Sequence, residues 1–233
     1  MPTKINMREI ILDTETTGLD PKDGHRIIEI AGVEIINKVR TGKFFHSYVN
    51  PLRDVPDDAF KIHGISTEFL KDKPTFDKIV KEFLEFVAGS KLVIHNAAFD
   101  MKFINHHLRE VNLEIIERGN VVDSLELARA KFPGAGNSLD ALCKRFGIDL
   151  GRRTKHGALL DSELLADVYI ELLGGNQISM FEIGLENSKL DRSEKRSPTT
   201  ANLNRREFPV SEADAEAHKQ FILKNLKENF WGY

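Results

Sequence analysis

The stretch that decides the fold is Ile10-Ile11-Leu12-Asp13-Thr14-Glu15-Thr16-Thr17-Gly18. Its three apolar residues predict a buried strand, and its closing glycine begins a turn. Because side chains alternate between the two faces of a strand, Asp13 and Glu15 should project from the same face, about 7 Å apart. Carboxylates held so close repel each other unless a proton or a cation lies between them, and their hard oxygens suit Mg²⁺ or Mn²⁺. An ordinary polar strand end explains the pair equally well, so the pair alone does not decide.

The chain around this stretch predicts three strands and then an alternation of helices and strands. Residues 26–36 are β-branched and apolar and residues 43–50 alternate, so both should join the first strand in an antiparallel meander. Helical spacing predicts helices over residues 75–87, 98–108, 124–131, 139–146 and 158–173, with short strands at 92–94 and 121–122. This order predicts an α/β fold, in which a sheet of mixed direction is flanked by helices.

The composition limits what the protein can be. A length of 233 residues allows one full domain plus an appendage. The 33 basic and 36 acidic residues give a net charge of -3, which lacks the basic excess of most non-specific nucleic-acid binders. The single Cys143 excludes a disulfide framework, and no uncharged apolar run approaches the ~18 residues of a membrane span. We therefore expect a soluble, cytoplasmic protein that would need local positive charges or bound cations to handle a polyanion.

Three further groups could carry chemistry, although each has an ordinary explanation. Asp100 and Asp161 fall in the first turns of expected helices, where an acidic side chain interacts favourably with the helix dipole. His156 lies in a loop, and a loop histidine is usually just solvated. Residues 151–155 place three cationic side chains beside His156. They could guide a phosphate to the acidic residues or form a solvated loop.

Taken together, these groups resemble the DEDDh family of 3′→5′ exonucleases. The motifs that carry the resemblance are Asp13-Thr14-Glu15-Thr16-Thr17-Gly18, His95-Asn96-Ala97-Ala98-Phe99-Asp100 and His156-Gly157-Ala158-Leu159-Leu160-Asp161. The related tyrosine branch places a tyrosine four residues before the last aspartate, but position 157 is glycine, so the histidine branch is the better match. The resemblance implies a ribonuclease H-like fold, which agrees with the predicted order of strands and helices.

The resemblance also implies a mechanism with two Mg²⁺ or Mn²⁺ ions. Asp13 would bridge both ions, Glu15 and Asp161 would complete the site that holds the attacking water, and Asp100 would act through a metal-bound water. His156 would be the general base, because a neutral imidazole accepts a proton at cellular pH. The products would be nucleoside 5′-monophosphates released from a 3′ end.

Several other residues are candidates for contact with the terminal nucleotide. Thr14 and Thr16 lie beside the strand carboxylates, and Asn96 matches a substrate-side position of the family. His63 lies in a segment that resembles a family element near the terminal base and sugar, although a packed turn explains it as well. His106 and His107 have no ligand spacing to a third group, so we expect both on a helix surface, and Cys143 reads as a core residue.

Within the exonucleases, four segments resemble the proofreading subunits of bacterial replicative DNA polymerases: residues 63–65, 73–76, 95–100 and 133–143. The resemblance extends past the domain to Gln177-Ile178-Ser179-Met180-Phe181. It implies that Gln177, Met180 and Phe181 fill a pocket on the sliding clamp. A frayed domain end is the alternative for this short segment.

The sequence predicts an exonuclease domain over residues 1–175, a clamp-binding peptide and linker over 176–207, and a helical tail over 208–233. Residues 187–207 contain only two large apolar side chains, Leu190 and Leu203, so this stretch should be flexible. Ser211 can cap a final helix whose apolar side chains would dock on the catalytic (alpha) subunit of the polymerase. The alternative is that this helix folds back onto its own domain.

The leading prediction is a proofreading 3′→5′ DNA exonuclease, with DNA 3′ ends as substrate. A free-standing RNA or oligoribonucleotide exonuclease of the same fold is the nearest alternative. A non-catalytic subunit that stabilises a polymerase is the alternative from a different class. Cleavage of matched DNA and RNA substrates would separate the three.

Overall fold

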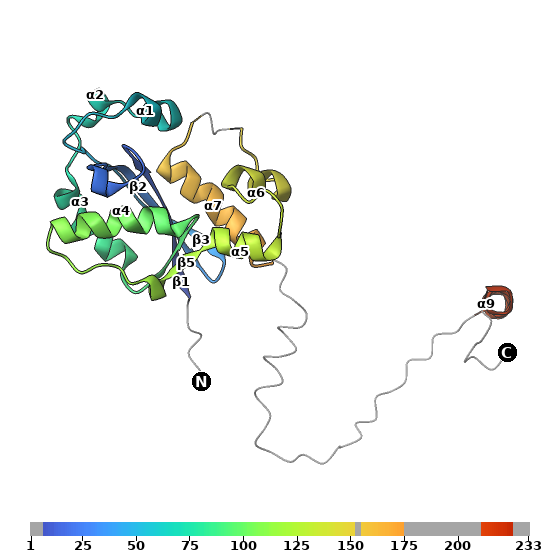
Figure 1. Cartoon of the computed structure of the whole chain (residues 1–233). Helices are drawn as coiled ribbons and strands as arrows, with labels where there is room; N and C mark the ends of the chain where they lie inside the picture. The colour runs from blue at the N-terminus through green and yellow to red at the C-terminus, as the bar shows by residue number, and fades with distance from the viewer. Residues whose placement is uncertain (1–6, 152–154, 175–210, 226–233) are drawn as a thin grey trace, which may run out of the picture. The chain divides into compact units, whose positions relative to one another are not determined.

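The computed structural model of this chain describes residues 7–151, 155–174 and 211–225 (Figure 1). The chain divides into two units, Met1–Ser179 and Met180–Tyr233. The predicted clamp-binding residues Gln177, Met180 and Phe181 lie outside the described residues, as does the whole expected linker over residues 176–207. The clamp site, the linker's flexibility and the domain boundaries therefore stay predictions. None of the described helices is long and apolar enough to cross a bilayer.

The first unit is built on a five-stranded sheet with the strand order β3-β2-β1-β4-β5. The strands are β1 (Arg8–Thr16), β2 (Ile27–Ile36), β3 (Val39–Tyr48), β4 (Lys91–Ile94) and β5 (Val121–Asp123). β2 runs antiparallel to β1 and β3, whereas β4 is parallel to both β1 and β5. The predicted meander, followed by parallel strands, is confirmed.

Eight α-helices are described: α1 (Asp57–His63), α2 (Thr67–Leu70), α3 (Phe76–Val87), α4 (Ala97–Glu110), α5 (Ser124–Lys131), α6 (Leu139–Phe146), α7 (Ala158–Leu172) and α9 (Glu212–Asn225). Each predicted helix is present within a few residues of its expected bounds. The helices α1 and α2 were not predicted from the sequence. Both are too short for an apolar stripe, and α1 starts without a side-chain cap.

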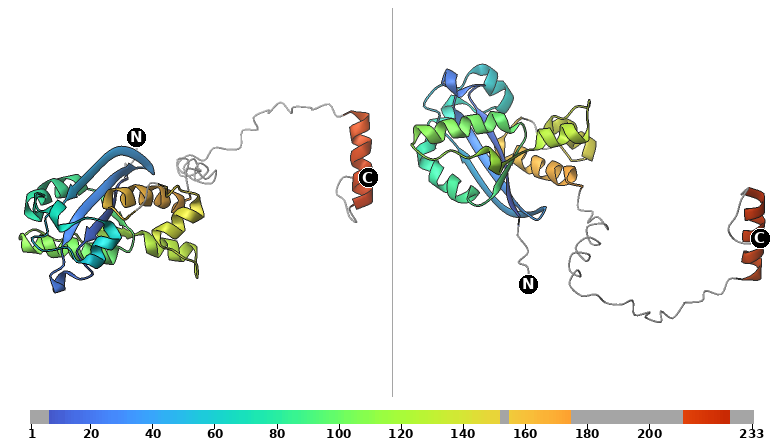
Figure 2. Two further views of the ribbon diagram at one scale, coloured as in Figure 1. Left: turned by 90° about the horizontal axis from the view of Figure 1, so that it is seen from above. Right: turned by 60° about the horizontal axis from the view of Figure 1, so that its bottom comes forward.

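The central strand β1 separates two apolar layers. Ile10 and Leu12 pack with the apolar sides of α3 and α4, whereas Ile11 packs against α7 with Leu165 and Tyr169. Figure 2 shows α3 and α4 on one side of the sheet and α7 on the other. By the alternation of a strand, Asp13 and Glu15 fall on the same side as Ile11, toward α7.

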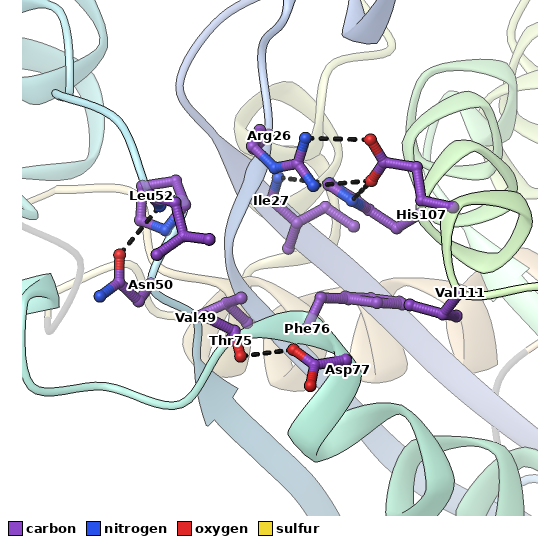
Figure 3. A pocket seen from close by; sticks show the side chains of 12 residues that line it. Arg26, Ile27, Val49, Asn50, Leu52, Thr75, Phe76, Asp77, His107 and Val111 are labelled. Carbon is purple, nitrogen blue, oxygen red and sulfur yellow. Dashed lines mark hydrogen bonds and ion pairs between the residues drawn. The ribbon is translucent and has the colours of Figure 1, made fainter.

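The prediction for His107 was wrong. Its ring is buried in α4, stacks on Phe76 with ring centroids 4.9 Å apart, and accepts the Ile27 N–H at Nε2 over 3.2 Å (Figure 3). Burial lowers its pKa to about 4. Phe103 lies one turn earlier on the buried stripe of α4, so position 107 continues that stripe toward the sheet. His106 is partly exposed, and Cys143 is in the core as expected.

The second unit is described at helix α9. The Asp214 N–H donates to Ser211 Oγ over 3.1 Å, so Ser211 caps the helix as predicted. Phe221 and Leu223 are 61% and 53% exposed. Each of these two large apolar side chains therefore keeps more than half of its surface accessible to solvent.

Candidate active site

The candidate carboxylates come from one strand and two helix starts. Asp13 and Glu15 lie near the C-terminal end of β1, Asp100 in the first turn of α4, and Asp161 in the first turn of α7. α4 follows β4, which is parallel to β1, so its first turn lies at the same edge of the sheet as Asp13. The topology thus brings together residues that are up to 148 positions apart in the chain.

Asp100 is tied directly to β1. Its carboxylate is 3% exposed and accepts two hydrogen bonds at Oδ1, from the Thr14 N–H over 3.1 Å and from the Thr14 hydroxyl over 2.7 Å. Burial raises the pKa of Asp100 to about 7, although the hydrogen bonds from Thr14 act in the opposite direction. A carboxyl group whose pKa lies near 7 can gain or lose its proton within the cellular pH range.

Asp13 is surrounded by the other carboxylates of the site, which repel its negative charge. Burial raises its pKa well above the ordinary value, and the neighbouring charges of Asp100, Glu15 and Asp161 raise it further. Positive charge that enters the cluster would lower the pKa of Asp13 again, because it favours the ionised carboxylate. The arrangement therefore favours the binding of a cation, which would relieve the repulsion among all four carboxylates.

Glu15, His156 and Asp161 form a compact group. Each offers one ligand atom, and these atoms lie within 4.8 Å of one another. His156 Nδ1 is 3.2 Å from Asp161 Oδ2, and the His156 side chain is 49% exposed. The backbone N–H of His156 donates to the Ile62 carbonyl over 3.3 Å, which joins this loop to the end of α1. The carboxylate oxygens of Glu15 and Asp161 suit Mg²⁺ or Mn²⁺.

His63, at the end of α1, offers a buried donor beside this group. Its Nδ1 accepts the Ile65 N–H over 3.0 Å, which places the ring proton on Nε2. Within the described residues Nε2 has no hydrogen-bond partner, and burial lowers the pKa of the ring. The Lys155 side chain lies against the following turn, because a Cβ on Gly64 would come within 2.7 Å of Lys155 Cδ.

With this geometry in place, comparison with known proteins decides the family. Residues 10–169 match the exonuclease family of the ribonuclease T type. The DNA polymerase III subunit epsilon of Rickettsia felis is 50% identical over 228 residues, which cover 95% of this chain and 98% of that protein. The subunit of the same name from Escherichia coli K12 is 49% identical over 180 residues, or 74% of each chain. The chain belongs to the exonuclease family.

Two solved structures resemble this exonuclease. Exonuclease X in complex with 5′ overhanging duplex DNA has a TM-score of 0.55 and 28% identity, over 72% of this chain and 91% of that one. The nuclease domain of 3′hExo, a DEDDh family member bound to rAMP, has a TM-score of 0.62 and 20% identity, over 73% and 94% of the two chains. The second likeness concerns the fold alone. The predicted ribonuclease H-like fold and the predicted function, a proofreading 3′→5′ exonuclease, are confirmed. The family depends on divalent metal ions.

The predicted substrate-side residues of the exonuclease differ in which of their polar groups are already hydrogen-bonded within the protein. The N–H and the hydroxyl of Thr14 both donate to Asp100. The Thr16 hydroxyl donates to the Gly18 carbonyl over 2.7 Å. Any contact of Thr14 with a nucleotide would therefore come from its carbonyl, and any contact of Thr16 from its backbone groups. Asn96 is exposed at the start of α4 with a φ of 67°, a left-handed conformation that asparagine tolerates better than most residues.

Sequence reasoning missed two carboxylates that hold the site together. Asp123, at the end of β5, accepts the N–H groups of Asn96 and Ala97 over 3.2 and 3.0 Å and also caps α5. Its position before Ser124 could have revealed the α5 cap, but not its contact with α4. Glu29 on β2 accepts the first N–H of α7, and no local pattern marks that contact.

Proposed function

We propose that the exonuclease removes nucleotides from DNA 3′ ends with two Mg²⁺ or Mn²⁺ ions held by Asp13, Glu15, Asp100 and Asp161. One observation carries this proposal: four carboxylates converge at one edge of the sheet, and the pKa values of Asp13 and Asp100 are raised by burial and repulsion. A phosphodiester is negative, so these acids would repel it without cations. Bound divalent ions would offset that charge, polarise the phosphate and acidify the attacking water.

His156 is the proposed general base. With Nδ1 directed at Asp161 Oδ2, the nitrogen that would accept the proton from the attacking water is Nε2. The contact with Asp161 orients the ring and stabilises the imidazolium formed when the proton arrives. The exposure of the side chain leaves the accepted proton a route to solvent. The released product would be a nucleoside 5′-monophosphate.

His63 is the proposed contact for the terminal nucleotide. A buried N–H without a partner costs about 1–3 kcal/mol, and a substrate oxygen placed against Nε2 would recover that cost. The Thr14 carbonyl, the Thr16 backbone and the exposed Asn96 side chain would supply the other contacts. These assignments complete the set of substrate-side residues expected from the sequence.

The polymerase and clamp contacts are part of the same proposal. The relative from Rickettsia felis, named a DNA polymerase III subunit, matches 95% of this chain, which includes residues beyond the exonuclease domain. We assign the tail over residues 208–233 to the catalytic (alpha) subunit and Gln177, Met180 and Phe181 to the sliding clamp. The exposed Phe221 and Leu223 support the first assignment. Association with the replication machinery would place the protein in the cytoplasm.

The activity is tested with purified full-length protein, Mg²⁺ or Mn²⁺, and 5′-labelled single-stranded DNA and RNA of identical sequence. We expect a DNA ladder that shortens from the 3′ end, slower cleavage of RNA, and no cleavage by Asp161→Ala. Preference for RNA would favour the free-standing RNA exonuclease instead. No cleavage of either substrate would favour the non-catalytic subunit.

The partner assignments are tested by binding. Deletion of residues 208–233 should weaken co-purification with the alpha subunit and spare exonuclease activity. The triple variant Gln177→Ala, Met180→Ala, Phe181→Ala should lose binding to the clamp in a pulldown. Unchanged binding in either experiment would contradict the corresponding assignment.

A further inference from the structure

Helix α7 carries Asp161 but has no cap of its own. Its N-cap residue is Gly157, which has no side chain to accept the N–H groups of the first turn. Backbone N–H groups at a buried helix start need an acceptor from elsewhere. That acceptor is Glu29, whose Oε2 takes the Ala158 N–H over 3.1 Å from 129 residues away in the sequence.

Glu29 is placed to connect the site's strand and helix. Glu29 is 3% exposed, and its other carboxylate oxygen, Oε1, lies 2.7 Å from His46 Nε2 on β3. In the register of β1 with β2, Glu29 is directly opposite Glu15. One buried side chain therefore fixes the start of α7 against the strand pair that carries Glu15.

We propose that Glu29 is a positioning residue that sets the distance of Asp161 and His156 from Glu15, and so shapes the metal-binding group. Both oxygens of Glu29 have hydrogen-bond partners, which distinguishes it from a metal ligand. A negative charge at a helix N-terminus is also favourable to the helix dipole. Loss of the contact would let Ala158, three residues before Asp161 in the same turn of α7, move away from β2.

The inference rests on the proposed function, because it takes Asp161 as a metal ligand. Residues that orient metal ligands typically contribute about 10–100-fold to metal affinity or activity. The effect should therefore be visible in the binding of the metal itself, apart from catalysis.

The chain offers a matched control on the same strand. Glu34 is 2% exposed and belongs to β2, but it pairs with Arg8 and lies opposite Ile10, away from the carboxylate cluster. Glu34→Ala removes an equally buried glutamate from the same strand. It should lower the melting temperature without changing the site.

The experiment measures Mn²⁺ binding to the full-length protein by the paramagnetic resonance signal of free Mn²⁺, with kcat and KM on single-stranded DNA beside it. We expect Glu29→Ala to weaken Mn²⁺ binding and to lower kcat, each about 10–100-fold, with KM for DNA within about threefold. Glu29→Gln should recover both to within about threefold, because its amide oxygen still accepts the Ala158 N–H. Glu34→Ala should keep the parent's Mn²⁺ affinity and kcat.

Two results would overturn the inference. Equal loss of Mn²⁺ affinity in Glu34→Ala would show a general effect of destabilisation. A Gln variant as impaired as Glu29→Ala would show that the charge of Glu29, as in a metal ligand, matters rather than its acceptor. If Glu29→Ala does not fold, Glu29→Asp takes its place, because the shorter side chain keeps the charge but withdraws from Ala158.

Asp161→Ala separates this inference from the proposed function. If that variant binds Mn²⁺ as the parent does, the proposed metal site fails. If Asp161→Ala loses Mn²⁺ while Glu29→Ala binds it normally, only the role of Glu29 fails.

Discussion

Two clusters of ionisable side chains in this exonuclease differ in their charges: one pairs opposite charges, and the other gathers acids together. Arg26, the residue before β2, binds both oxygens of Glu110 on α4 over 3.1 and 2.6 Å. His107 Nδ1 lies 3.0 Å from Glu110 Oε2, and the three residues line a cavity of about 270 Å³ (Figure 3). Burial alone would raise the pKa of Glu110, but the bonds from Arg26 and His107 lower it overall. At the sheet edge, Asp13 is instead surrounded by other acids.

The difference supports separate roles for the two clusters. Charges that are paired, as at Glu110, join elements of the fold at little cost. Acids that are buried together, as at Asp13 and Asp100, destabilise the metal-free protein and persist only where a function requires them. The repulsion is thus the feature that supports the proposed metal site, and the following changes test the contrast.

The largest effect should come from removing the central acid. Asp13→Asn keeps the shape of the side chain but removes the negative charge that would hold the proposed ions. We expect loss of DNA cleavage by about 10³-fold or more, measured with 5′-labelled single-stranded DNA and Mg²⁺. Glu110→Gln is the control from the paired cluster, and it should retain the parent's rate. Full activity in Asp13→Asn would remove Asp13 from the site.

The second effect concerns stability without metal. The folded-state pKa of Asp100 is about 7 against an ordinary 3.8, so between these pH values the folded protein holds a proton that the unfolded chain has lost. Asp100 therefore lowers the free energy of unfolding as the pH rises through that window, by about 4 kcal/mol at most. In EDTA, Asp100→Asn should remove the cost and be more stable than the parent at pH 8. Urea unfolding measures it, and equal pH dependence of the two proteins would contradict it.

The third effect has the opposite sign. The pKa of His107 is about 4 when folded and 6.5 in the ordinary state, so between these values the unfolded chain binds a proton that the folded protein does not. Stability from this group is complete above pH 6.5 and is lost as pH falls toward 4, by about 3 kcal/mol. His107→Gln should lack this loss. Because the Asp100 and His107 contributions oppose each other in the parent, urea unfolding of each variant must be compared with the parent at every pH. A constant difference between His107→Gln and the parent would contradict the assignment.

The outcome for the two clusters also shows what sequence can predict. The apolar run of β1, its two carboxylates and the helix starts at Asp100 and Asp161 follow local rules of periodicity and capping. The contact of Glu29 with Ala158 joins residues 129 positions apart, so it depends on the closed sheet and has no local pattern. His107 was misplaced for a similar reason. From the sequence alone, a polar residue on a helix is expected at the surface. The partners that explain the burial of His107, Ile27 and Glu110, are known only from the structure.

The smallest effect should come from the paired cluster itself. Arg26 and Glu110 are 31% and 36% exposed at their side chains, and ion pairs this accessible typically contribute about 0.2–1 kcal/mol. Arg26→Met should lower the free energy of unfolding by about 1 kcal/mol or less, and 1 M NaCl should reduce the difference because salt screens exposed pairs. Exonuclease activity should be unchanged. A loss of several kcal/mol, or one that salt does not reduce, would mean that Arg26 acts mainly by covering His107 rather than by charge. In that case the paired cluster would depend on burial as strongly as the carboxylate cluster at Asp13 and Asp100 does.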